Sequence, residues 1–174
     1  MPQRKRVNNK ARTKILIADS EAVFRLGLKK LFSVEDDLRV VAQAENHLQL
    51  VAMARTFRPD LALVQQEIAL NNGQGLLGQI HREFPTCLVV ITTSHMSSVE
   101  GEQIIRDGAS GVIPRSAQPE IFVENIRKVL KGEVIHPPQK DNGNGPVSFS
   151  KHTHSRPIDT LTPREKTIIS CLTQ

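Results

Sequence analysis

Short, largely apolar runs recur along the chain, and each is bounded by polar or turn-forming residues. The runs cover residues 14–18, 38–44, 61–64, 88–92 and 112–113. Runs of this length are typical of strands that are buried on both faces of a sheet. The run at 61–64 is the clearest, because the turn signal Pro59-Asp60 precedes it and the polar residues Gln65-Gln66-Glu67 follow it.

The segments between these runs have apolar residues three or four positions apart, which predicts helices with one buried face. The first helix follows Ser20, and the later ones are expected at residues 47–57, 75–84, 99–107 and 119–131. Pro119 suits the first turn of the last helix. The helix at 99–107 is weak, since it has only Val99, Ile104 and Ile105 to bury.

Strict alternation of strands and helices predicts an α/β fold, in which a parallel sheet is covered by helices on both faces. Right-handed crossovers leave few topologies for such a chain. The common five-stranded arrangement has the flavodoxin-like order 2-1-3-4-5. We therefore expect one domain of this kind over residues 14–135.

The N-terminal segment, residues 1–13, is basic and has no apolar periodicity, so we expect a disordered arm. The first 14 residues contain six basic side chains and no acidic one, although the net charge of the whole chain is only +5. Such an arm suits contact with nucleic acid or an anionic surface, or simple solvation. We expect neither a signal peptide nor a membrane span, and Cys87 and Cys171 have no metal-type spacing, so the expectation is a cytoplasmic protein with reduced thiols.

The C-terminal part breaks the pattern. Residues 136–160 are rich in Pro, Gly, Asn, Ser and His, which predicts a flexible linker. Another helix is expected over 161–174, because Thr162 is a good N-cap and Glu165 completes a capping box. A single helix of this length cannot fold alone, so it either packs on the first domain or begins a second one.

Polar side chains follow the predicted strands at their carboxyl ends. They are Asp19, Ser20, Gln65, Thr93 and Arg115. Ligands of open parallel sheets bind at this edge, so these residues form a candidate site. Taken singly, Asp19 is also suited to cap the next helix, and the Arg115 side chain to reach solvent.

This constellation resembles the receiver domain of bacterial response regulators of the NarL/LuxR type. The matching motifs are Ile15-Leu16-Ile17-Ala18-Asp19, Phe24-Arg25-x-Gly27-Leu28, Pro59-Asp60-Leu61, Gly108-Ala109-x-Gly111 and Leu161-Thr162-Pro163-Arg164-Glu165. The last motif is similar to the opening of the family's DNA-binding helix-turn-helix domain, so residues 161–174 are expected to be its first helix, truncated. The resemblance implies a pocket in which an Asp after the third strand accepts a phosphoryl group beside Mg²⁺.

Three residues depart from that pattern. Gln65 replaces the phosphoryl-accepting Asp, Ser20 replaces the second acid of the first strand, and Arg115 replaces a Lys. An amide is not a nucleophile, so Gln65 cannot form an acyl phosphate. Mg²⁺ prefers carboxylate oxygens, so its binding is expected to be weak or absent, and no other cofactor is implied. We expect Asp19 to pair with Arg115, Gln65 to hydrogen-bond both, and Thr93 to remain at the edge of a pocket locked in one state.

Association is then the expected role of the surface. The candidate dimer surface consists of Val23, Gly27, Lys30, Ile121 and Val123 on the first and last helices of the domain. Small and apolar residues on exposed helix faces favour an isologous homodimer. The side of the fifth strand is an alternative interface, and scattered apolar surface residues without function are a further alternative.

Two classes of function remain open, and neither is an enzyme. The first is a DNA-binding transcription regulator whose degenerate receiver serves as a dimerisation module without phosphorylation. The second is an adaptor that docks a partner protein without DNA. A receiver that senses a small ligand, or is phosphorylated at a non-standard residue, is a weaker alternative. Specific DNA binding is expected only of a full-length protein that carries a recognition helix.

Overall fold

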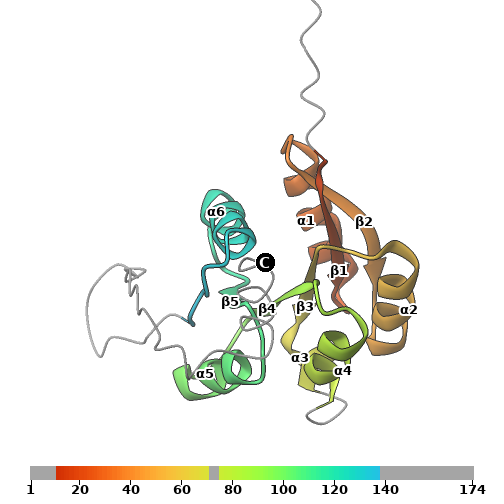
Figure 1. Cartoon of the computed structure of the whole chain (residues 1–174). Helices are drawn as coiled ribbons and strands as arrows, with labels where there is room; N and C mark the ends of the chain where they lie inside the picture. Colours follow the sequence, from red (N-terminus) through yellow and green to blue (C-terminus); the bar gives the residue numbers. More distant parts are fainter. Residues whose placement is uncertain (1–10, 71–74, 138–174) are drawn as a thin grey trace, which may run out of the picture.

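The computed structural model of the protein describes residues 11–70 and 75–137 (Figure 1). In chain order its elements are β1 (Thr13–Ala18), α1 (Ala22–Ser33), β2 (Leu38–Ala44), α2 (His47–Phe57), β3 (Leu61–Gln65), α3 (Gln66–Leu70), α4 (Leu76–Glu83), β4 (Leu88–Thr93), α5 (Ser98–Arg106), β5 (Gly111–Pro114) and α6 (Pro119–Leu130). Residues 1–10 and 138–174 lie outside the described residues. They hold most of the predicted arm and linker and all of the predicted C-terminal helix.

The strands form one parallel sheet in the order β2-β1-β3-β4-β5. The central strand, β3, pairs with β1 on one side and β4 on the other. All five of its residues are buried, which explains why this stretch is apolar until Gln65. The predicted α/β fold and strand order are confirmed.

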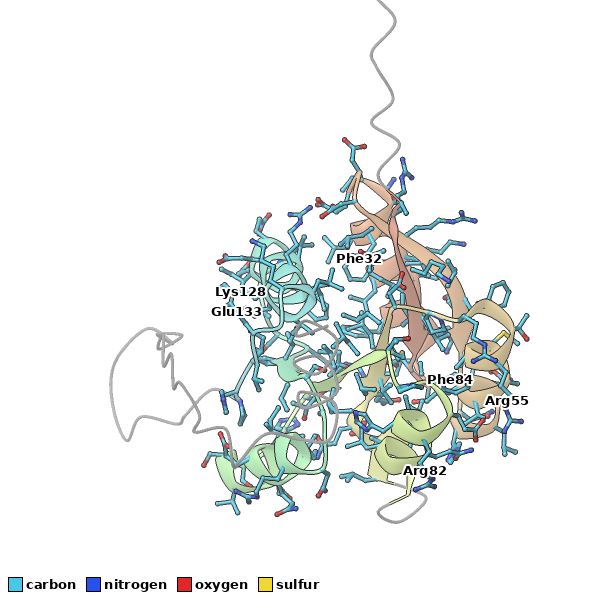
Figure 2. The ribbon with its side chains drawn as sticks, viewed as in Figure 1. Phe32, Arg55, Arg82, Phe84, Lys128 and Glu133 are labelled. Atoms are coloured by element: carbon cyan, nitrogen blue, oxygen red, sulfur yellow. The ribbon has the colours of Figure 1, made fainter. Side chains whose placement is uncertain are left out.

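The helices cover both faces of the sheet and bury a separate apolar cluster on each. On one face α1 and α6 share a cluster in which the rings of Phe32 and Phe122 lie 6.4 Å apart, measured between centroids. On the other face α2, α4 and α5 bury a cluster that includes Leu50, Phe84 and Ile104. Phe32 and Phe84, labelled in Figure 2, therefore mark the two layers.

Some predicted details were wrong. Residues 66–70 form an additional short helix, α3, directly after β3, where only polar and turn residues were expected. Val99 was expected to be buried but is 72% exposed, because it lies in the first turn of α5 and the buried residues of that helix come later. The capping box of Ser97 and Glu100 starts this helix at Ser98, one residue earlier than predicted.

The helices of the described part of the chain are short; the longest, α1 and α6, have 12 residues each. Among residues 11–70 and 75–137, no helix combines the length and apolar character that crossing a membrane requires.

Candidate functional site at the carboxyl edge of the sheet

The structure brings together all five residues predicted for the pocket. Gln65 and Thr93 are the last residues of β3 and β4, Asp19 and Ser20 follow β1, and Arg115 follows β5. Because the strands are parallel, their carboxyl ends meet at one edge of the sheet. Asp19, Gln65 and Thr93 are all buried there.

A buried ion pair joins the first and fifth strands. Arg115 Nη1 donates to Asp19 Oδ2 at 2.9 Å, and the two side chains are 10% and 1% exposed. The second amino group of Arg115 lies 2.9 Å from Glu21 Oε2, and its guanidinium carbon lies 3.9 Å from the centroid of the Phe24 ring. The backbone N–H of Arg115 donates to the carbonyl oxygen of Thr93 at 2.8 Å, which fixes the start of this side chain. The pairing of Asp19 with Arg115 is therefore present as predicted.

Gln65 does not have the partners that were predicted for it. Its Oε1 accepts two hydrogen bonds from Ser20, one from the backbone N–H and one from Oγ, both at 2.8 Å. The amide thus ties β3 to the loop after β1 instead of bridging Asp19 and Arg115. The physical reason is that the Glu21 N–H and the Arg115 guanidinium already engage the two oxygens of Asp19, while two donors of Ser20 lie 2.8 Å from the Gln65 amide oxygen.

Two residues of the site were missed in the sequence. Gln66, the first residue of the unpredicted α3, accepts a hydrogen bond from the Thr93 hydroxyl. Arg25, which is 9% exposed, donates to the backbone carbonyl of Asp19 at 2.6 Å and to Glu45 Oε1 at 2.7 Å. The available signal for Arg25 was its place in the Phe24-Arg25-x-Gly27-Leu28 motif, since a charged residue within an apolar helix face needs a buried partner.

The charge state of the Asp19 carboxyl depends on its burial and on two neighbours, the Glu21 backbone N–H and Arg115. Burial raises the pKa of Asp19, and this effect outweighs the opposite influence of the Glu21 backbone N–H and the Arg115 charge. The Glu21 N–H donates to Asp19 Oδ1 at 2.8 Å, so both carboxylate oxygens are engaged. The site is therefore a closed network rather than a cluster of repelling acids.

The residues of this edge do not fit the divalent cation that the resemblance implies. Mg²⁺ needs several oxygen ligands in octahedral geometry, preferably carboxylates. Here both Asp19 oxygens accept hydrogen bonds, and the Ser20 hydroxyl donates to Gln65. In the part of the chain that the structure describes, no three His, Cys, Asp or Glu side chains are grouped so that they could hold a metal ion.

The candidate dimer surface is present only in part. Val23, Gly27 and Lys30 are exposed on α1, and Ile121 is partly exposed on α6. Val123, however, is 4% exposed and belongs to the core cluster under α1 and α6, so its assignment to the surface was wrong. The reason is that the buried stripe of α6 is broader than the periodicity indicated.

The sheet order and the polar edge define the class of protein as a receiver-type α/β domain. The chain belongs to the response regulator receiver domain family, whose model matches residues 15–127. The nitrate/nitrite response regulator protein NarL of Escherichia coli strain K12 is 24% identical over 173 residues, which cover 97% of this chain and 78% of NarL. The transcriptional regulatory protein DegU of Brevibacillus brevis is 22% identical over 180 residues, which cover 95% of this chain and 76% of DegU. The chain is thus homologous to NarL/LuxR-type response regulators.

Solved structures show the same fold. A LuxR-family two-component response regulator from Aurantimonas sp. SI85-9A1 superposes with a TM-score of 0.67 at 23% identity, covering 74% of this chain and 91% of that one. The isolated receiver domain of RcsB from Salmonella enterica serovar Typhimurium superposes with a TM-score of 0.65 at 16% identity, covering 72% of this chain and 94% of that one. At sequence identities of 23% and 16%, these superpositions establish a shared fold.

Proposed function

We propose that this chain is a phosphorylation-independent receiver that serves as the regulatory and dimerisation module of a DNA-binding transcription regulator. The observation that carries the proposal is the closed network at the carboxyl edge, in which an amide stands at the acceptor position and Arg115 engages Asp19. No cofactor is required, and Mg²⁺ binding is weak or absent.

The chemistry of Gln65 supports the loss of phosphoryl transfer. A receiver is phosphorylated when a carboxylate oxygen attacks phosphorus and forms an acyl phosphate, and a neutral amide oxygen is too weak a nucleophile for this step. The Gln65 oxygen also accepts two hydrogen bonds from Ser20, which reduce its nucleophilicity further. We infer that this position holds the loop after β1 in place.

The charge balance of the pocket supports a fixed state. Clustered acids repel one another until a cation or phosphoryl group arrives, and this makes an ordinary receiver switchable. Here the Asp19 carboxylate already has a tethered cation 2.9 Å away, and the Thr93 hydroxyl already has an acceptor in Gln66. The Thr93 and Arg115 side chains, which stand where the family binds a phosphoryl group, thus already have partners within the pocket.

The role in transcription rests on the relatives. DegU is named a transcriptional regulatory protein, and a structure of RcsB is described as two dimers bound to two parallel DNAs. We extend dimerisation and DNA binding to the full-length form of this protein, with the receiver bringing two DNA-binding domains together. Docking of a different partner protein is the alternative, and a chain that stays monomeric in the light scattering below would favour it.

The test is intact mass spectrometry of the 174-residue chain after incubation with acetyl phosphate and Mg²⁺, beside light scattering before and after treatment. A receiver that retains its acids is the positive control, and the double variant Ser20→Asp/Gln65→Asp tests whether the acids alone restore the site. The proposal predicts no mass increase and an unchanged dimer for the natural chain. A phosphoryl adduct, or a monomer that dimerises on treatment, would overturn it.

A further inference from the structure

A hollow lies beside the closed network, over the half of the sheet formed by β2, β1 and β3. Its volume is about 330 Å³, which is within the range of small-molecule sites. Its lining comes from the loops after these three strands and from α2 and α3, and includes Ser20, Glu45, Leu48, Gln65, Glu67 and Ile68. No described lining residue belongs to β4, β5 or the loops that follow them. The hollow is therefore separate from the ion pair of Asp19 and Arg115, although Ser20 and Gln65 contribute to both the hollow and the network.

The Gln65 amide presents an unused donor to this hollow. Its Oε1 accepts from the Ser20 backbone N–H, which can only donate, so the orientation of the amide is fixed and Nε2 is the free end. Gln65 is 5% exposed, and its Nε2 donates to no acceptor among the described residues. The buried side-chain polar atom that lacks a partner in this part of the chain is Asn125 Nδ2, so Gln65 Nε2 keeps access to the hollow that its residue lines. A donor in so buried a residue favours an acceptor oxygen in whatever fills the hollow.

Two carboxylates give the hollow a preference for cations. Glu45 binds Arg25 through Oε1 at 2.7 Å, and its side chain remains 59% exposed. Glu67 is exposed, and its carboxylate forms no ion pair or hydrogen bond with another described residue. No described lining residue is Lys or Arg, so the surplus charge of the hollow is negative. A cation is therefore attracted to this hollow and an anion is repelled.

The lining also offers apolar contact. Ile68 is 6% exposed and forms part of the wall, while Leu48 contributes from α2 and is 81% exposed. A single exposed leucine is common on a protein surface. Beside a hollow that contains a buried donor and two carboxylates, the same leucine supplies the apolar surface that small-molecule sites combine with a few polar groups. A ligand of this hollow therefore needs a compact apolar group in addition to its polar atoms.

We propose that this hollow binds a small primary amine that also carries a carbonyl oxygen and a compact apolar group. The ammonium group pairs with the carboxylates of Glu67 and Glu45, and the carbonyl oxygen accepts from Gln65 Nε2. The inference goes beyond the proposed function, because it gives the domain a chemical input and does not depend on dimerisation. Since Gln65 also holds Ser20, a ligand on Nε2 contacts the residue that ties the loop after β1 to the sheet.

The test is a titration of the isotope-labelled 174-residue chain with leucinamide, followed by NMR chemical shifts. Leucinamide combines an ammonium group, a carbonyl oxygen and a branched apolar side chain. Two matched compounds each lack one feature: N-acetylleucinamide has no cation, and isoamylamine has no carbonyl oxygen. Leucinamide should give saturable shifts around the hollow, at residues 20, 45–48 and 65–68. Each matched compound should bind about fivefold more weakly or worse.

Substitutions assign the two polar contacts. Glu67→Gln removes an exposed charge and should weaken leucinamide about three- to fivefold, without changing the binding of N-acetylleucinamide. Glu120→Gln, at an equally exposed position in the first turn of α6, is the matched control and should change neither. Gln65→Glu keeps an oxygen for the Ser20 donors but replaces Nε2 by an acceptor, so leucinamide should lose its advantage over isoamylamine. A merely structural role of Gln65 would affect both amines equally.

Three results would overturn the proposal. The first is the absence of saturable shifts up to about 10 mM leucinamide, which would mean that water alone fills the hollow. The second is equal binding of all three compounds, and the third is a set of shifts spread over other acidic groups, such as Glu35 and Asp37. These titrations contain no phosphodonor and measure no association, so their failure would leave the proposed function intact. A phosphoryl adduct in the mass experiment would overturn the proposed function without deciding whether the amine binds.

Discussion

Removal of the Arg115 guanidinium is the most direct perturbation of the closed network. The variant Arg115→Met keeps most of the aliphatic volume and removes the charge. It leaves the Asp19 carboxylate, which is 1% exposed, without the cation that now lies 2.9 Å from it. The main expected effect is a loss of stability, because an uncompensated buried charge is strongly unfavourable.

The size of the loss follows from the contacts that disappear. Breaking a buried ion pair by removing one partner costs about 3–5 kcal/mol. Loss of the stacking on Phe24, at 3.9 Å from the ring centroid, adds about 0.5–2 kcal/mol. The contact with Glu21, whose side chain is 63% exposed, adds little. The expected total is about 3.5–7 kcal/mol, which is a large part of the roughly 5–15 kcal/mol by which domains are stable.

The assay is equilibrium unfolding in urea at pH 7, for the natural chain, Arg115→Met, Asp19→Asn and the double variant. Equal m-values establish that all four unfold from similarly compact states. Since the double variant contains no buried charge at this pair, it should recover about 2–3 kcal/mol relative to Arg115→Met. An Arg115→Met loss below about 1 kcal/mol, or a double variant no more stable than Arg115→Met, would refute the reasoning.

Three further predictions concern single groups. Burial raises the pKa of Asp19, so the folded chain should hold this proton more tightly than the unfolded chain does. The stability of the natural chain relative to Asp19→Asn should therefore be greatest below the unfolded-state pKa of about 3.9 and fall as the pH rises through the folded-state pKa. Unfolding titrations at several pH values measure this stability difference, and a difference that grows with pH would contradict the prediction. Ser97→Ala removes the hydroxyl that caps α5 and should lower the unfolding free energy by about 1 kcal/mol, measured by urea titration. Gly108→Ala should cost about 1–3 kcal/mol, because φ is +110° and the new Cβ would lie 2.6 Å from His81 Cε1. Gly132→Ala, with φ of +91° and nothing within 4 Å, is its control for backbone strain and must cost less.

The closed network is compatible with both parts of the proposed function, a site that does not accept phosphate and a surface that associates. In a switchable receiver, a bound cation or phosphoryl group shifts the pocket and the outer helices together from one conformation to another. Here Arg115 supplies a permanent charge and contacts the ring of Phe24 on α1. A mutation in the pocket is therefore expected to alter association without any phosphoryl group.

Local patterns in the sequence were sufficient for the fold and for the positions of the site residues. The continuous apolar run at 61–64 predicted a strand buried on both faces, and β3 is such a strand. Strict alternation with helices then left one common topology, and the carboxyl ends of its strands bring Asp19, Gln65 and Arg115 to one edge. These features follow from periodicity and connectivity, which a single chain displays directly.

Tertiary structure alone decided which side chains contact one another. Gln65 bonds Ser20 rather than Asp19, because the rotamer of an amide depends on the donors that the loop after β1 places beside it. The burial of Val123 depends on how α6 is rotated against the sheet and α1, and periodicity fixes this rotation only to within one residue of the stripe. The contact of Ile135 with β5 joins residues 24 positions apart and leaves no local pattern. The sequence by itself thus determined the scaffold and the chemistry available at its edge, whereas packing between distant segments decided how that chemistry is connected.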